Sequence, residues 1–119
     1  MGGRLLESLE KARTAVKIAS DKQAEDIVLL DIRRLCSFAD FFVICSAQSS
    51  RQITGLCDDL GEALSGPDAS LRHREGSSDS GWVLLDFGDL VVHVFSPERR
   101  RFYALEELWK AAPTLLRVQ

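Results

Sequence analysis

The sequence of 119 residues has little that would mark a secreted, membrane-spanning or metal-stapled protein. Its three cysteines, Cys36, Cys45 and Cys57, form an odd set without C-x-x-C spacing, which argues against a disulfide framework and a zinc site. No apolar run is long enough to cross a bilayer, and the N-terminus shows no apolar signal-peptide core. We therefore expect a cytoplasmic protein whose core needs no metal, cofactor or disulfide bond.

Phosphate-binding and catalytic signatures are missing as well. The sequence has no G-x-G-x-x-G and no G-x-x-x-x-G-K, and no Ser/His/Asp or Cys/His set has a catalytic spacing. The net charge is −3 with a pI near 5.3, and the one local basic run is at 99–101. Since nucleic-acid binding usually needs a basic face, this balance favours a protein or small-molecule partner, in particular a basic one.

What is present is a hydrophobic pattern typical of one α/β domain spanning residues 1–119. Helical periodicity predicts helices over 4–19, from a cap at Ser49 to Gly66, and from a cap at Ser96 to Pro113. Strands are predicted at 26–32, 38–46, 70–75, 82–86 and 89–95. We expect a mixed β-sheet of about five strands with helices packed on it.

The last two predicted strands form a hairpin whose sequence is mostly apolar but contains three ionisable residues, Asp86, Asp89 and His93. A two-residue turn at Phe87-Gly88 would set Asp86 opposite Asp89 and Trp82 opposite His93. Because side chains alternate along a strand, one face is then wholly aliphatic and belongs to the core. The other face mixes aromatic and polar groups, and it holds Trp82, Leu84, Asp86, Asp89, Val91, His93 and Phe95.

This mixed face has two interpretations. Aspartates flanking a turn often serve the turn, and a strand histidine is often a structural one. Binding surfaces, however, combine aromatic anchors with polar groups in this way. Two opposed carboxylates repel each other, so a basic group elsewhere in the chain, a basic partner or a metal would compensate them.

Metal-dependent nucleotidyl transfer is the enzymatic alternative. Such enzymes carry a Gly-Ser at a helix start and two carboxylates at positions i and i+2 of the next strand, where both reach the same cations. Here Gly76-Ser77 lies in a predicted loop, and Asp89 follows Asp86 at i+3 across a turn. The pattern is a near miss, so we expect no catalytic residue.

Three blocks in order resemble the ribosomal silencing factor family, RsfS, also called Iojap. They are FADFFVICSAQSSRQI at 38–53, GWVLLDFGDLVVHVF at 81–95 and RRFYALEELW at 100–109. The resemblance covers about residues 25–109 and implies a nucleotidyltransferase-like fold without catalytic residues, hence no enzyme. It also implies binding to large-subunit ribosomal protein L-fourteen on the large ribosomal subunit, which blocks subunit joining and represses translation. Some members form homodimers, and organellar members act in large-subunit assembly.

The resemblance also points to the residues that meet the partner. In the leading hypothesis the mixed face of the hairpin docks on a basic patch of the ribosomal protein. A second hypothesis makes the same face a homodimer interface, and a third is the nucleotidyltransferase using Asp86 and Asp89. The expected partner-binding residues are Trp82, Asp86, Asp89, Val91, His93, Phe95 and Tyr103.

Overall fold

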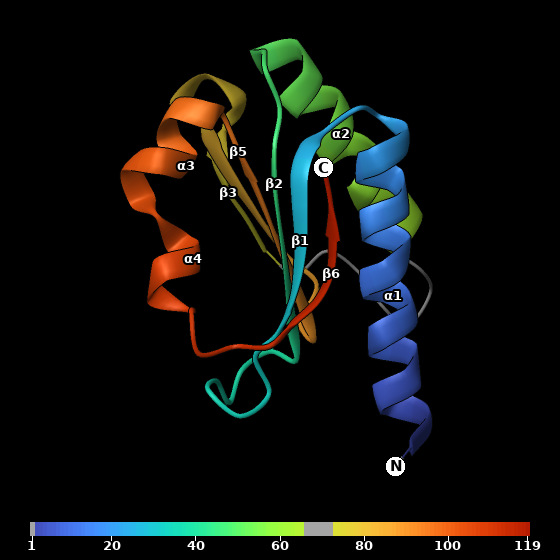
Figure 1. Cartoon of the computed structure of the whole chain (residues 1–119). Coiled ribbons are helices and arrows are strands. Elements are labelled where there is room, and N and C mark those ends of the chain that lie inside the picture. The colour runs from blue at the N-terminus through green and yellow to red at the C-terminus, as the bar shows by residue number, and fades with distance from the viewer. Residues whose placement is uncertain (1, 66–72) are drawn as a thin grey trace.

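The structure, a computed structural model, describes residues 2–65 and 73–119, which form one six-stranded sheet between two layers of helices (Figure 1). Within these residues no helix is both long and apolar enough to cross a membrane. The helices are α1 (Gly2–Asp21), α2 (Ser50–Leu64), α3 (Pro97–Tyr103) and α4 (Leu105–Leu108), with a short 3-10 helix at Ser78–Ser80. The strands are β1 (Glu25–Asp31), β2 (Phe41–Ser46), β3 (His73–Ser77), β4 (Trp82–Asp86), β5 (Leu90–Phe95) and β6 (Thr114–Val118).

The sheet is mixed, as the sequence predicted, with the strand order β3-β4-β5-β2-β1-β6. The central pair β2–β5 is parallel, and all other neighbours are antiparallel. The chain runs from β2 through α2 to the edge strand β3, so the crossover passes over β5 and β4. The sixth strand, β6, pairs with β1 in a tail to which the sequence assigned no structure.

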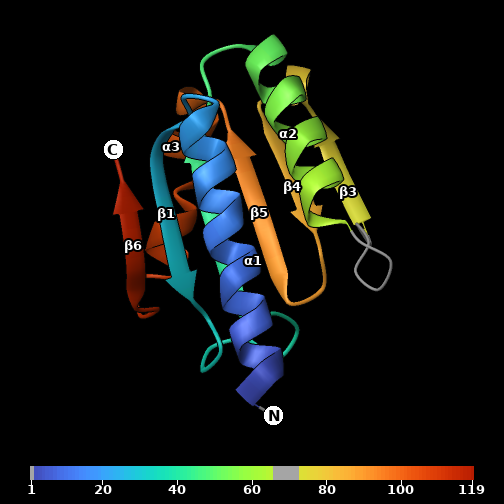
Figure 2. The ribbon, with the colours of Figure 1, turned by 90° about the vertical axis from the view of Figure 1, so that its right-hand side faces the viewer.

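One face of the sheet, the inner face, is covered by α1 and α2 (Figure 2). The helices bury Ala12, Val16, Leu56 and Leu60 against aliphatic strand residues, and burial of such apolar area is the main stabilising term. The hairpin contributes its aliphatic side to this core, as expected. Those side chains are Val83, Leu85, Leu90, Val92 and Val94, all fully buried.

The opposite face, the outer face, carries a second core beneath α3 and α4. It joins Phe42 and Ile44 of β2 to Phe95 of β5 and to Leu105 of α4. Trp109 closes this core with its ring edge-on to Phe42, the centroids 5.0 Å apart. The β2–β5 centre of the sheet is therefore buried on both faces, which agrees with the continuous apolar run of β2.

The C-terminal helix differs from the prediction, which had one helix from Ser96 to Pro113. Ser96 does cap α3, with its hydroxyl accepting from Arg99 N at 3.2 Å, and Pro97 follows. The helix ends at Ala104, whose φ of 46° is left-handed. The expected apolar stripe is therefore divided: Leu105 is buried, whereas Phe102 and Leu108 are 71% and 76% exposed.

The segment before the hairpin also differs in detail. A strand at 70–75 and a loop at 76–81 were expected, but β3 spans His73–Ser77 and the 3-10 helix follows it. Positions 70–72 of the expected strand lie outside the described residues.

The predicted cap of α2 is present, since Ser49 Oγ accepts from Gln52 N at 3.1 Å. The reciprocal contact goes one residue further back than in a capping box, from Gln48 N to Gln52 Oε1 at 2.8 Å.

Cys45 of β2 and Cys57 of α2 are buried, and Cys36 is half-buried. Burial raises the pKa of the Cys45 thiol to about 12 and that of Cys57 to about 11. Both therefore stay protonated at neutral pH and act as small core residues.

Candidate functional site

The hairpin turn lies one residue later than the sequence suggested. Phe87 N donates to Leu90 O at 2.8 Å, so the two loop residues are Gly88 and Asp89. Gly88 has a φ of 93°, and glycine at the first loop position is what a type II′ turn requires. The register pairs Asp86 with Val91 instead of Asp89, and the predicted pairing of the two aspartates is wrong.

Asp89 consequently leaves the mixed face and meets α1. Its carboxylate accepts from Ser8 Oγ at 2.5 Å and from Lys11 Nζ at 2.9 Å. Partial burial by itself raises the pKa of Asp89, but the hydrogen bonds from Ser8 and Lys11 and the ammonium charge outweigh it and leave the pKa lowered. The compensating cation therefore comes from the chain itself, on the inner side.

Asp86 keeps its place on the outer face but also serves the turn. Its Oδ1 accepts from Gly88 N at 2.7 Å, the local hydrogen bond that makes aspartate common beside turns. Asp86 and Asp89 thus lie on opposite sides of the hairpin and cannot hold one cation together. The described residues contain no group of three or more His, Cys, Asp and Glu arranged for a metal. Ser77 caps only the three-residue 3-10 helix, so the nucleotidyltransferase hypothesis is wrong on geometry.

The remaining residues of the predicted face do share the outer face, because the shift in register keeps the alternation of side chains. Most of them are covered. Val91, His93 and Phe95 are buried beneath α3 and α4, with His93 4% exposed. A partner cannot touch these three side chains without displacing the helices, so they support the site from below.

His93 is held inside an aromatic cluster. Its ring stands edge-on to Phe42 with centroids 4.8 Å apart, and its Nδ1 accepts from Trp82 Nε1 at 3.3 Å. Nε2 is buried and has no hydrogen-bond partner in the described structure. Burial lowers the pKa of His93 to about 4, so the imidazole is neutral at physiological pH. Its role is to orient Trp82.

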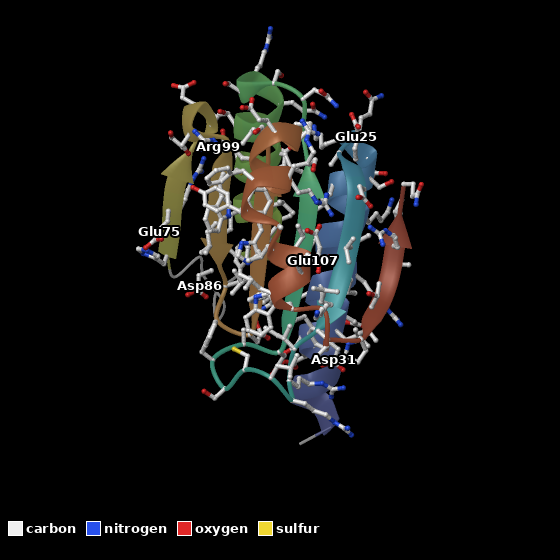
Figure 3. All side chains as sticks on the ribbon, turned by 60° about the vertical axis from the view of Figure 1, so that its left-hand side comes forward. Glu25, Asp31, Glu75, Asp86, Arg99 and Glu107 are labelled. Carbon is white, nitrogen blue, oxygen red and sulfur yellow. The ribbon has the colours of Figure 1, made fainter. Side chains whose placement is uncertain are left out.

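The part of the outer face that stays open lies over β3 and β4. Cross-strand pairing aligns Glu75 with Leu84 and His73 with Asp86, so these side chains form rows across the two strands. Figure 3 looks onto this face, with Glu75 and Asp86 labelled beside the helices that cover β5 and β2. We call this surface the β3–β4 strip. It consists of His73, Glu75, Trp82, Leu84, Asp86 and Tyr103.

The sequence analysis placed Trp82, Leu84 and Asp86 on the mixed face and named Tyr103 as a partner-binding residue. It did not include His73 and Glu75. His73 is an exposed residue of the edge strand β3. Only the pairing of β3 with β4 places residues 73 and 75 beside the hairpin. The available signal was the alternation of 73, 75 and 77, which would share one face of a strand.

An amphipathic hollow lies at the Trp82 end of the strip. The ring centroids of Trp82 and Tyr103 are 4.5 Å apart, and the Trp82 ring also stacks on Phe95 with centroids 5.1 Å apart. A cavity of about 210 Å³ is bounded by these rings. Its lining residues are Glu75, Gly76, Ser80, Trp82, Leu84 and Tyr103.

Comparison with known proteins decides the family. The sequence profile described as "Ribosomal silencing factor during starvation" matches residues 6–119. The chain belongs to the RsfS family. A ribosomal silencing factor RsfS from Halalkalibacterium halodurans is 38% identical over 106 residues, covering 89% of this chain and 91% of that protein. RsfS of Bacillus subtilis is 37% identical over 101 residues, which cover 85% and 86% of the two chains. The chloroplastic Iojap protein of Zea mays is 42% identical over 106 residues, but these cover only 45% of its length.

Solved structures agree with this assignment to RsfS. A crystal structure of a Chromobacterium violaceum protein superposes with a TM-score of 0.80 at 31% identity, covering 86% of this chain and 85% of that one. A crystal structure from Bacillus halodurans gives 0.74 at 34% identity, covering 96% and 98%. The predicted resemblance is confirmed, and with it the expectation of a non-enzymatic factor.

Proposed function

We propose that this RsfS chain binds large-subunit ribosomal protein L-fourteen on the large ribosomal subunit and sterically blocks subunit joining, which represses translation. Family membership supports the ribosomal setting. The β3–β4 strip supports the docking surface, because it joins exposed acidic and aromatic side chains on one face. We place this activity in the cytoplasm, beside bacterial-type ribosomes.

The observation that carries the docking surface is the contrast between the two halves of the outer face. Over β5 and β2 the helices α3 and α4 cover the sheet. Over β3 and β4, half-exposed Trp82 and Leu84 share a face with Glu75, which is opposite Leu84, and with Asp86, which follows Leu84 on that face. Interface centres combine aromatic and aliphatic anchors with a polar rim. The negative charges on this strip, in a chain of net charge −3, suit a basic ribosomal protein.

The mechanism needs no chemistry. A domain whose Cα atoms extend 40 × 33 × 23 Å, docked on the subunit-facing surface of the large subunit, occupies space that the small subunit needs. Inhibition then depends only on occupancy, so it should follow the affinity of the docked complex and be relieved by excess small subunits.

Co-sedimentation with large subunits of Bacillus subtilis tests the proposal. Leu84→Lys places a cation in the middle of the strip, where it repels a basic partner and is tolerated by the neighbouring Glu75. Leu115→Lys is the matched control, since Leu115 is exposed on β6 at the other edge of the sheet. We expect Leu84→Lys to lose binding and Leu115→Lys to keep it. Equal binding by both variants would remove the strip from consideration.

A homodimer through the same strip is the alternative arrangement. Sedimentation equilibrium of wild type and Leu84→Lys, run beside the binding assay, separates the two. A shift from dimer to monomer with ribosome binding retained would assign the strip to self-association.

A role mainly in large-subunit assembly is a separate alternative. In cells depleted of the protein, precursor particles of the large subunit would then accumulate, while the mature subunits would still join normally.

A further inference from the structure

We propose that the hollow bounded by Glu75, Trp82, Leu84 and Tyr103 takes one arginine side chain of the protein partner. The inference rests on the proposed docking function and names the group that the strip recognises. Three features carry it: two aromatic rings, an exposed carboxylate opposite them, and an aliphatic floor.

The two rings provide faces for a cation. The ring centroids of Trp82 and Tyr103 lie 4.5 Å apart at an interplanar angle of 50°, so the two rings are in tilted contact and line the cavity side by side. The Trp82 indole is fixed from below by Phe95 and by its hydrogen bond to His93, and Tyr103 is 40% exposed. A cation over the face of such a ring is attracted by the ring quadrupole, and rings that are already held in place lower the entropy cost of binding.

Glu75 supplies the countercharge. It lies directly across from Leu84 in the β3–β4 register and lines the same cavity as both rings. Its side chain is 65% exposed, and Oε1 lies 2.7 Å from His73 Nε2. A carboxylate has two oxygens and about four acceptor sites, so Glu75 can accept from a partner while it keeps the histidine contact.

The shape of the hollow favours arginine over lysine. A guanidinium group is planar, stacks on aromatic rings and donates two parallel hydrogen bonds to a carboxylate. Leu84 between the rings and Glu75 offers apolar contact to the methylene stem of the side chain. Lysine presents a compact, strongly hydrated ammonium that uses neither the ring faces nor the fork geometry as fully.

Titration of the ¹⁵N-labelled chain with N-acetyl-arginine amide tests the hollow without any ribosome. N-acetyl-citrulline amide is the matched probe, since it has nearly the same shape and no charge. We expect the Trp82 indole N–H signal to shift with the arginine amide and not with the citrulline amide, and Glu75→Gln to abolish the shift. Equal shifts with both probes, no shift with either, or a larger shift with N-acetyl-lysine amide would overturn the proposal.

Binding to large subunits gives the second measurement. Glu75→Gln should weaken the affinity about tenfold, the scale of one charge-assisted pair, and Glu75→Arg should weaken it further. The control is Glu62→Gln, the same change at an exposed position of α2 on the other side of the sheet. Affinities of Glu75→Gln and Glu62→Gln within twofold of each other would contradict the inference. Absence of binding by the wild type would instead contradict the proposed function, and the amide titration would then decide the hollow alone.

Discussion

The indole nitrogen of Trp82 donates a hydrogen bond to Nδ1 of His93, with the two atoms 3.3 Å apart. This bond fixes which nitrogen of the buried, neutral imidazole carries the proton. Because Nδ1 accepts, the proton of the neutral ring resides on Nε2. A protonated ring would need Nδ1 as a donor and would lose the bond. The hydrogen bond that orients Trp82 is therefore sensitive to pH.

Stability should fall in mildly acidic solution. The pKa of His93 is about 4 in the folded chain against an ordinary 6.5, so between these values the unfolded chain binds a proton that the folded chain does not. The stabilising contribution is complete above pH 6.5 and is lost as the pH falls toward 4, up to about 3 kcal/mol. Urea unfolding at pH 7.5, 6 and 5 measures it.

The control for this pH dependence is His93→Gln, which cannot titrate. Its free energy of unfolding should change less across the same range, while His73 and the carboxyl groups remain in both proteins and cancel in the comparison. Parallel pH profiles of the two proteins would show that His93 is not the titrating group.

Asp89→Asn should destabilise the fold without affecting ribosome binding. The change weakens the hydrogen bonds from Ser8 and Lys11 and leaves a partly buried ammonium without its countercharge. We expect a loss of about 1–3 kcal/mol at neutral pH, measured by urea unfolding. Since the pKa of Asp89 is lowered, the loss should shrink only below pH 4, as the wild-type carboxylate protonates. Unchanged stability with lost co-sedimentation would return Asp89 to the docking surface.

Arg100→Ala should be among the more damaging single changes. The Arg100 side chain is 9% exposed; it donates to Asp26 O at 2.6 Å and Ser46 Oγ at 3.0 Å and pairs with Glu106. Removing it leaves polar groups at the end of the sheet unpaired, at a cost of about 3–5 kcal/mol in thermal or chemical unfolding. Arg101→Ala, next to it and exposed, should stay within about 0.5 kcal/mol of wild type. Similar effects of the two changes would contradict a structural role for Arg100.

Gly76→Ala should disturb the strip through the backbone. The φ of Gly76 is 82°, and an added Cβ would lie 2.0 Å from the carbonyl oxygen of Trp82. We expect a loss of about 2 kcal/mol or more, with weaker ribosome binding as β3 moves away from β4. Gly61→Ala in α2, where the added Cβ meets nothing within 4 Å, should instead stabilise by about 0.5–1 kcal/mol. A well-folded Gly76→Ala protein with full binding would show that β3 is dispensable to the site.

Local rules predicted much of this structure. The caps at Ser49 and Ser96 each depend on a serine hydroxyl that accepts from a backbone N–H three residues later. The aliphatic face of the hairpin depends only on the alternation of side chains along a strand. Both were confirmed. The turn was misplaced because glycine is favoured at either loop position. The hydrogen bond from Phe87 N to Leu90 O in the structure is what makes Gly88 the first loop residue.

The other main errors concern contacts between distant segments. Lys11 and Asp89 are 78 positions apart in the sequence. The residues near the hairpin therefore gave no sign that Lys11 would neutralise the Asp89 carboxylate. The cover over Val91 and Phe95 required α3 and α4 to fold back onto the outer face, and the break at Ala104 that allows this has no proline or glycine to signal it. The mixed face of the hairpin was interpreted as an interface, but its β5 half belongs to the second hydrophobic core.

The pairing of β6 with β1 also bears on how the chain folds. Arg117 meets Asp26 across 91 positions, and β1 lies inside the sheet only after residues 114–118 have reached it. Contacts of such high sequence separation slow folding. During synthesis β1 therefore keeps an unpaired edge until about the last of these residues leaves the ribosome, which makes the nascent chain open to wrong strand partners until that moment.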